Sequence, residues 1–307
     1  MNIRNFRKML EAQWAKGNFL CVGLDPDTEK MPDHLKKDVR LRDRMTRIFC
    51  RQIVEATKDL VCAYKPNSAF FEGIGVNGEE VLSYVINTIR ELAPDVPIIL
   101  DAKRGDIGST NVGYVKSVFT WLKADAITVN PYLGAEALEP FLEQTDKGII
   151  VLCRTSNPGA GEFQDIGITF DLEEGRFIRE KTGSYIMSSK GYHGKLYEHV
   201  AYQVSQRWNT NSNCGLVVGA TYPFQLKNIR KIVGDMPILI PGIGFQQEGI
   251  SIKEQIKQVV TAGKDSQGQG MIISLSRSII FASKGTDFAD AARHKALKIR
   301  DLINEYR

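Results

Sequence analysis

Eight short apolar runs recur along this chain, and a longer segment with helical periodicity follows each of them. Such runs are typical of strands that are buried on both faces. Their regular alternation with helices predicts a parallel sheet with crossover connections. The runs cover residues 19–24, 61–64, 97–100, 126–129, 148–152, 215–218, 237–240 and 271–274. Eight units fit a closed (β/α)8 barrel, the TIM barrel, better than an open doubly wound sheet, so we predict an α/β protein with one TIM-barrel domain over residues 1–307.

The expected helices lie between these strands, and two further segments need a separate explanation. The helices cover residues 35–59, 79–92, 110–123, 135–144, 195–208, 223–232, 251–261 and 287–306. Residues 1–18 carry apolar side chains at helical spacing, which predicts an amphipathic helix that closes one end of the fold. A targeting peptide would also be basic, but Glu11 interrupts the basic run and a strand follows directly. Residues 155–194, rich in glycine, serine and charge, predict a long loop after the fifth strand, either a lid or binding loop or a locally disordered segment.

The bulk composition argues against several classes of function. The formal net charge of +4 is weak and spread along the chain, so we expect no nucleic-acid partner, although this charge suits a small anionic substrate. No apolar run approaches the roughly 20 residues that a membrane-spanning helix needs, so we expect no membrane association. The five cysteines are odd in number and show no paired spacing, which disfavours disulfides and predicts a cytoplasmic protein.

A cluster of charged residues follows the third apolar run, in the stretch Asp101-Ala-Lys103-Arg-Gly-Asp106. Side chains alternate along a strand, so Asp101 and Lys103 point to the same side, and Asp106 follows at the mouth of the next loop. Charges at the end of an apolar strand cost several kcal/mol each unless they are paired. We interpret the cluster as part of an active site, in preference to an ordinary ion pair at a strand end.

Nearly every expected strand ends in a polar residue, and barrel closure would bring these residues to the rim where such barrels carry their active sites. They are Asp25, Lys65, Asn67, Asp101, Lys103, Asn130, residues 154–157, Thr221, residues 242–246 and Arg277. None of the four histidines falls at a strand end, and each lysine would repel a cation held by the carboxylates. No dinucleotide-binding motif is found in the required context. We predict a site without metal or cofactor, whose lysines and aspartates stabilise a developing carbanion and protonate it.

The ends of the last two strands predict a phosphate site. Ile240-Pro-Gly-Ile-Gly244-Phe-Gln246 closes the seventh strand, and Arg277 lies just after the eighth. Glycines expose backbone N–H groups, and a guanidinium offers a planar fork that matches a phosphate. Gly-x-Gly alone is about as typical of a turn as of a phosphate cradle. Together with Arg277 it favours a phosphate monoester as substrate, because barrel phosphate sites often use these two loops.

These motifs together resemble the orotidine 5′-phosphate decarboxylase family, and more narrowly its second bacterial type. The Asp-x-Lys-x-x-Asp signature of the family is found at Asp101, Lys103 and Asp106. Further markers are Cys21-Val-Gly-Leu-Asp25-Pro, Tyr64-Lys65-Pro-Asn67, Val129-Asn130-Pro-Tyr-Leu-Gly134, Arg154-Thr-Ser-Asn-Pro-Gly159 and Pro241-Gly-Ile-Gly244. The resemblance implies cofactor-free decarboxylation of orotidine 5′-phosphate to uridine 5′-phosphate (UMP), the last step of de novo UMP biosynthesis. The chain departs from the expected glycine-rich pattern at Phe245-Gln246-Gln247-Glu248, so which glutamine reaches the phosphate stays open.

The resemblance also implies a role for each site residue. Lys103 protonates the C6 carbanion, Asp101 lies near the departing carboxylate, and Lys65 bridges the ribose and the carboxylate network. Asp106 reaches the ribose end of the partner's site in a homodimer with shared active sites. The substrate-binding set comprises Asp25 at the ribose, Ile107 and Thr110 beside Asp106, Ser156 and Asn130 at the pyrimidine, and Gly244, Gln246 and Arg277 at the phosphate.

Three alternatives differ in chemistry. A sugar-phosphate epimerase or synthase of the same fold would usually need a metal, which the scarcity of histidine disfavours. An aldolase would use Lys65 or Lys103 as a Schiff base, but neighbouring aspartates favour protonated lysines. A non-catalytic nucleotide sensor could keep the phosphate site, yet it would not need Asp101 and Lys103, which are both present.

Overall fold

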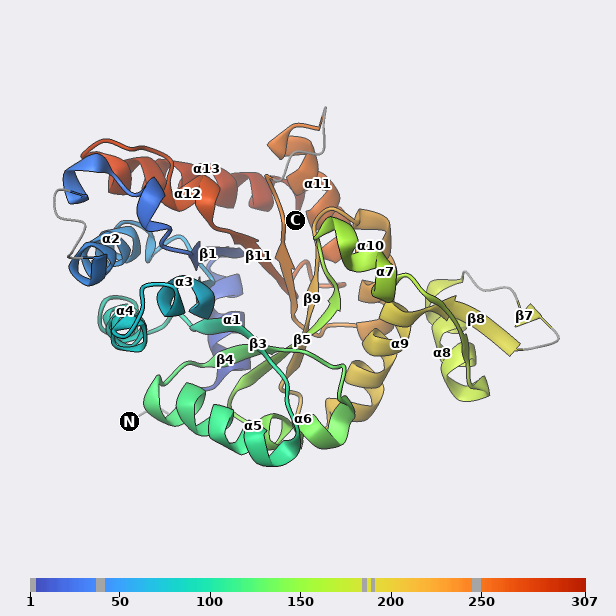
Figure 1. Cartoon of the computed structure of the whole chain (residues 1–307). Helices are drawn as coiled ribbons and strands as arrows, with labels where there is room; N and C mark the ends of the chain where they lie inside the picture. The colour runs from blue at the N-terminus through green and yellow to red at the C-terminus, as the bar shows by residue number, and fades with distance from the viewer. Residues whose placement is uncertain (1–3, 37–41, 184–186, 189–190, 245–249) are drawn as a thin grey trace.

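Eight parallel strands form the central sheet of the computed structural model, which describes residues 4–36, 42–183, 187–188, 191–244 and 250–307. The strand order is β2-β1-β11-β10-β9-β5-β4-β3. Isolated parallel bridges pair Tyr64 with Ile98 and Asn67 with Asp101, so the two end strands meet and the sheet closes into a barrel (Figure 1). The strands are β1 Leu20–Leu24, β2 Ala63–Pro66, β3 Ile99–Arg104, β4 Ala126–Val129, β5 Gly148–Arg154, β9 Cys214–Val218, β10 Ile238–Pro241 and β11 Met271–Leu275. The predicted eight-stranded barrel is confirmed, and each expected run contributes one strand.

Helices surround the barrel because each has one apolar stripe to bury (Figure 1). In α4 (Gly78–Leu92), for example, Val81, Val85 and Ile89 are buried at a spacing of four residues. The others are α2 Arg42–Thr57, α5 Gly108–Val115, α6 Gly134–Leu142, α9 Leu196–Tyr202, α10 Pro223–Val233, α11 Ile252–Gly263 and α13 Phe288–Tyr306. Short π-helical segments, Lys116–Trp121 and Gln203–Trp208, continue α5 and α9. The first expected helix differs, since Asp33–Leu35 forms a separate 3₁₀ turn after Pro32. No helix among the described residues is long and apolar enough to cross a membrane.

Helix α1 (Phe6–Ala15) lies within the amphipathic segment expected at residues 1–18 and packs across the N-terminal end of the barrel. The ring of Phe6 packs against Gly148, the first residue of β5, where any Cβ would collide with it. The buried indole of Trp14 donates a hydrogen bond to the carbonyl of Met271, the first residue of β11, at 2.9 Å. These contacts close the N-terminal end of the barrel, whereas the polar strand-end residues lie at its C-terminal end.

The segment 155–194 is not the long irregular loop that its composition predicts. It contains α7 (Gly161–Gln164), α8 (Leu172–Thr182) and a small antiparallel sheet in the order β6-β8-β7. The strands are β6 Gly167–Phe170, β7 Met187–Ser188 and β8 Gly191–Lys195. Glycine and charge serve defined structural purposes here. Asp171 caps α8 by accepting a hydrogen bond from the Glu174 N–H at 2.8 Å, and Gly183 ends the helix with a φ of +73°.

The closing helix α1 generates a stability prediction. Trp14→Ala removes a buried indole and its hydrogen bond, so we expect the free energy of unfolding to fall by about 3–5 kcal/mol. Trp121→Ala is the matched control, because the Trp121 side chain is largely exposed and its loss should change stability by less than about 0.5 kcal/mol. Urea denaturation of the two variants measures both values. Equal effects at the two positions would contradict the assigned role of α1.

Candidate active site

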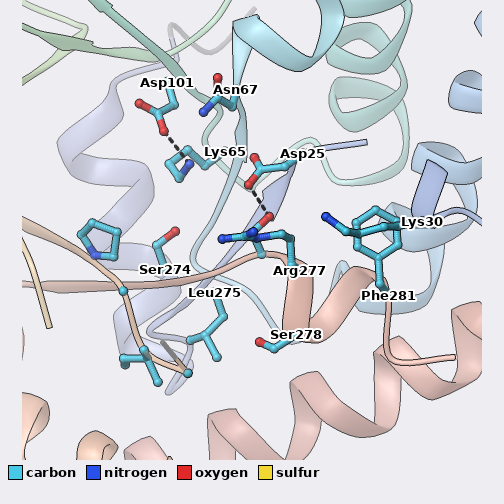
Figure 2. Close-up of a pocket in the computed structure, with 15 residues that line it drawn as sticks. Asp25, Lys30, Lys65, Asn67, Asp101, Ser274, Leu275, Arg277, Ser278 and Phe281 are labelled. Atoms are coloured by element: carbon cyan, nitrogen blue, oxygen red, sulfur yellow. Dashed lines mark hydrogen bonds and ion pairs between the residues drawn. The ribbon is translucent and has the colours of Figure 1, made fainter. Parts of the chain in front are cut away.

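A cavity of about 670 Å³ opens at the C-terminal ends of the barrel strands. Its wall combines residues from the ends of β1, β2, β3, β10 and β11, as Figure 2 shows. The lining residues are Asp25, Lys30, Lys65, Asn67, Asp101, Pro241, Gly242, Ile243, Gly244, Ser274, Leu275, Ser276, Arg277, Ser278 and Phe281. Barrel closure therefore gathers Asp25, Lys65, Asn67, Asp101, residues 242–244 and Arg277 around one pocket, whereas Lys103 is not among the lining residues.

Asp101 lies between two ammonium groups. Its Oδ2 atom is 2.7 Å from Lys65 Nζ, and its Oδ1 atom is 2.7 Å from Lys103 Nζ. The side chains of Lys65 and Asp101 are buried, whereas that of Lys103 is 51% exposed. The same carboxylate thus holds one lysine inside the barrel and a second lysine that solvent or a ligand can reach.

This arrangement fixes the charge on two of the three groups. Burial alone would raise the pKa of the Asp101 carboxyl, but the ammonium groups of Lys65 and Lys103 together hold it well below its usual range. Burial likewise disfavours the charged form of Lys65, yet the nearby carboxylates of Asp101 and Asp25 raise its pKa above the ordinary value. At neutral pH both groups are charged, so Lys65 is unsuited to form a Schiff base, which requires a neutral amine.

Asp25 is the second carboxylate in the cavity wall, and one of its oxygens has no partner. Ser276 Oγ donates to Asp25 Oδ2 at 2.5 Å (Figure 2), whereas the buried Asp25 Oδ1 atom makes no hydrogen bond among the described residues. Gly23 allows this approach of β1 and the β11 end, because a Cβ there would lie 2.7 Å from Ser276 Cβ. A buried acceptor without a donor is costly, so a ligand hydroxyl in the cavity would satisfy it.

The ends of β10 and β11 form a further part of the cavity wall. Gly242 and Gly244 adopt φ values of +102° and +84°, in the left-handed region that favours glycine. The Gly244 N–H donates to Gln255 Oε1 at 3.0 Å, and Arg277 starts the short helix α12 (Arg277–Ile280). Gln246 and Gln247 lie outside the described residues. Among the described residues, no group of three or more histidine, cysteine, aspartate or glutamate side chains could hold a metal ion.

Comparison with known proteins agrees with this geometry. A family model described as "Orotidine 5'-phosphate decarboxylase / HUMPS family" matches residues 18–174. The chain belongs to this family. Curated relatives named orotidine 5′-phosphate decarboxylase support the membership over the full length. One from Azoarcus sp. is 44% identical, and the match covers 99% of this chain and 100% of that relative. One from Janthinobacterium sp. is 43% identical, and the match covers 98% of each chain.

Solved structures of the orotidine 5′-phosphate decarboxylase family share this barrel. The chain is 34% identical to a Leishmania donovani orotidine monophosphate decarboxylase, with a TM-score of 0.74 and coverage of 97% of this chain and 99% of that one. A Leishmania donovani UMP synthase is 35% identical with a TM-score of 0.79, and the match covers 99% of this chain but 56% of the synthase chain.

The structure places the remaining expected site residues in different surroundings. Ser156 does not line the cavity but lies beside the lining residue Gly242, where a Cβ would be 3.1 Å from Ser156 Oγ. Asn130 does not line the cavity, and its Oδ1 atom accepts a hydrogen bond from the Tyr132 N–H at 3.1 Å.

Three expected residues, Asp106, Ile107 and Thr110, lie at the start of α5 and do not line the cavity of their own chain. Asp106 Oδ1 accepts from the Ile107 N–H at 2.6 Å, and the Asn111 amide bonds to the backbone of Asp106. Ile107 and Thr110 are exposed.

Several polar residues near the site were not assigned from the sequence, among them Ser276, Lys30 and Thr128. Ser276 bonds to Asp25, Lys30 lines the cavity, and Thr128 Oγ1 lies 2.9 Å from Asp101 Oδ1. Thr128 carries a detectable signal, because it places a hydroxyl inside the otherwise apolar run 126–129. Lys30 ends the 3₁₀ helix Thr28–Lys30 and Ser276 is the N-cap residue of α12, positions where lysine and serine are common, so their types alone indicate no role.

The double pairing of Asp101 predicts an asymmetry in stability. Asp101→Asn removes the carboxylate that both ammonium groups contact, and we expect the free energy of unfolding to fall by about 3–5 kcal/mol at pH 7. Lys65→Met should cost less, because Asp101 keeps its contact with Lys103. Denaturant titration of both variants measures the difference, and an Asp101→Asn variant as stable as Lys65→Met would contradict it.

The lowered pKa of Asp101 also fixes the sign of the pH effect. The carboxylate stabilises the folded state fully above its unfolded pKa of about 4, and this contribution is lost as pH falls through the lower folded-state value. The advantage of the wild type over Asp101→Asn should therefore be constant between pH 5 and pH 7 and should shrink below about pH 4.

Proposed function

We propose that this protein decarboxylates orotidine 5′-phosphate to uridine 5′-phosphate, the last step of de novo UMP biosynthesis, without a cofactor. The observation that carries the proposal is the Lys65–Asp101–Lys103 triad, whose Lys65 and Asp101 line a cavity that Arg277 also lines. Curated relatives of the same length bear the name of this activity. The cavity combines a part with Lys65 and Asp101, which suits the reaction, with the guanidinium of Arg277, which suits a phosphate.

The charged end suggests how the reaction proceeds. The Asp101 carboxylate, held ionised by two lysines, would lie against the substrate carboxylate, and the repulsion is relieved when carbon dioxide departs. The bond from C6 to the carboxylate carbon breaks, and its electron pair remains on C6. Lys103, whose ammonium is half-exposed beside Asp101, then donates a proton to C6 and regains one from water. Lys65 keeps Asp101 charged and reaches toward the ribose.

Substrate binding uses the rest of the cavity. Asp25 Oδ1, which is buried and accepts no hydrogen bond from the described residues, suits a ribose hydroxyl. Ser156, beside the lining residue Gly242, suits the pyrimidine. Arg277 and the glycine-rich turn at Gly244 suit the phosphate, with Gln246 or Gln247 as a further contact. Binding energy gained at this remote phosphate can stabilise the closed arrangement around the reacting ring.

We further propose a homodimer in which Asp106, Ile107 and Thr110 complete the partner's site. These residues lie outside the cavity of their own chain. The neighbouring helices α5 and α6 and the residues just before them carry exposed apolar side chains, namely Ile107, Val112, Tyr132 and Leu133. Exposed apolar side chains on neighbouring elements favour a protein interface.

The modest charge of +4 gives no support for a nucleic-acid partner, and the five cysteines are free and buried. We propose a cytoplasmic location on these grounds.

The activity itself is tested with purified protein and orotidine 5′-phosphate, followed by the loss of substrate absorbance. We expect turnover without any added cofactor, and unchanged turnover after prolonged dialysis against a chelator. Activity that disappears on dialysis and returns with Zn²⁺ or Mg²⁺ would instead support a metal-dependent enzyme of the same fold.

The two ends of the cavity should respond differently to substitution. Lys103→Ala removes the proton donor, so kcat should fall by about three orders of magnitude or more while binding of the product UMP changes little. Arg277→Ala removes a phosphate contact and should mainly raise KM, by roughly 30- to 1,000-fold. A loss below tenfold in Lys103→Ala, or a kcat defect without a KM effect in Arg277→Ala, would contradict these roles.

Shared sites predict complementation between two inactive variants. Lys103→Ala and Asp106→Ala should each be nearly inactive as homodimers. In a mixed dimer one site collects both substitutions and the other has neither, so random exchange should restore about one quarter of wild-type activity. Subunit exchange is verified separately with tagged chains. Mixtures that exchange but stay inactive would show that Asp106 serves the site of its own subunit.

A further inference from the structure

The parallel ladder between β3 and β4 is interrupted at the site. Ile99 pairs with Ala126 and Leu100 with Ile127, but the next pair is Arg104 with Val129. Residues 101–103 therefore stand opposite the single residue Thr128. Such an irregularity re-aims side chains and leaves backbone groups without their ladder partners. Asp101 and Lys103 both lie in it, so its geometry decides where the two charged groups point.

The hydroxyl of Thr128 replaces the missing ladder contacts. It accepts a hydrogen bond from the Lys103 N–H at 3.0 Å, and it donates to Asp101 Oδ1 at 2.9 Å. The direction is determined, because a hydroxyl has one proton and a backbone N–H can only donate. Thr128 is buried, so solvent does not compete for either bond.

The backbone at Lys103 needs such support. Its φ is +47°, a left-handed conformation that is unfavourable for a residue with a Cβ. Strained residues of this kind persist where the surroundings hold them in place. The Thr128 hydroxyl holds the Lys103 backbone directly, and through Asp101 Oδ1 it also fixes the oxygen that binds Lys103 Nζ at 2.7 Å.

We propose that Thr128 is a positioning residue for the reaction, whose hydroxyl sets the place of the Lys103 ammonium by bonding to its backbone and to its counter-ion. This inference rests on the proposed decarboxylation. Thr128 itself does not line the cavity and is assigned no contact with substrate. Its effect should therefore fall on the chemical step and leave substrate binding nearly unchanged.

The test separates the hydroxyl from the shape of the side chain. Thr128→Val keeps the branched shape and removes both hydrogen bonds, so kcat should fall by about 10- to 100-fold with KM changed less than about threefold. Thr128→Ser keeps the hydroxyl and should restore kcat to within about threefold of the wild type. Thr46→Val is the matched control, because Thr46 is buried on α2 and its hydroxyl has no partner to lose among the described residues. Its kcat should equal that of the wild type.

Stability and folding are measured on the same preparations by thermal denaturation and circular dichroism. If Thr128→Val does not fold, Thr128→Cys replaces it, since a thiol bonds weakly and kcat should lie well below that of Thr128→Ser. Wild-type kcat in Thr128→Val and Thr128→Cys would overturn the role of Thr128. A Thr128→Ser variant as impaired as Thr128→Val would also overturn it. An inactive wild-type protein would instead overturn the proposed function, so the two failures are distinguishable.

Discussion

The site depends on one carboxylate that is shared by two ammonium groups. Asp101 sits at the end of an apolar strand, where an unpaired charge would be costly, and Lys65 and Lys103 together keep it ionised. The triad carries a net positive charge, so it can accept an anionic substrate although it contains a carboxylate. Remaining contacts in this region, from Thr128 and from the bridge between Asn67 and Asp101, hold the carboxylate in its place.

The barrel makes this arrangement possible by joining positions far apart in the sequence. Asp25 directly follows β1, Lys65 lies in β2 and Arg277 starts α12 after β11, and all three line one cavity. Helix α1 closes the opposite end, so the polar ends of the strands form the accessible mouth. The scaffold and the chemistry are thus divided between the two ends of one barrel.

Much of this architecture follows from periodicity in the sequence. Apolar runs flanked by helices predict the barrel, because strands buried on both faces are typical of parallel sheets covered by helices. The charged residues at the strand ends predict which end of the barrel carries the site. Segment 155–194 was predicted wrongly as a loop, because its three short strands and its charged helix α8 have no strong apolar pattern. Thr128 was missed for another reason. Its hydroxyl stands out in the apolar run 126–129, but its role arises from a shift of register between two strands, which the run alone does not reveal.

Closure of the barrel has a consequence for its tolerance of heat. Neighbouring strands elsewhere share ladders of consecutive pairs, which shift register between β3 and β4 and between β5 and β9, whereas β2 and β3 meet through two isolated bridges. This seam is also the place where the Lys65–Asp101 ion pair crosses from one strand to the next. Local unfolding needs least free energy where the fewest hydrogen bonds must break. We therefore expect β2 and β3 to separate before the other strands of the barrel. The protein would then lose its working geometry while most of its secondary structure is still intact.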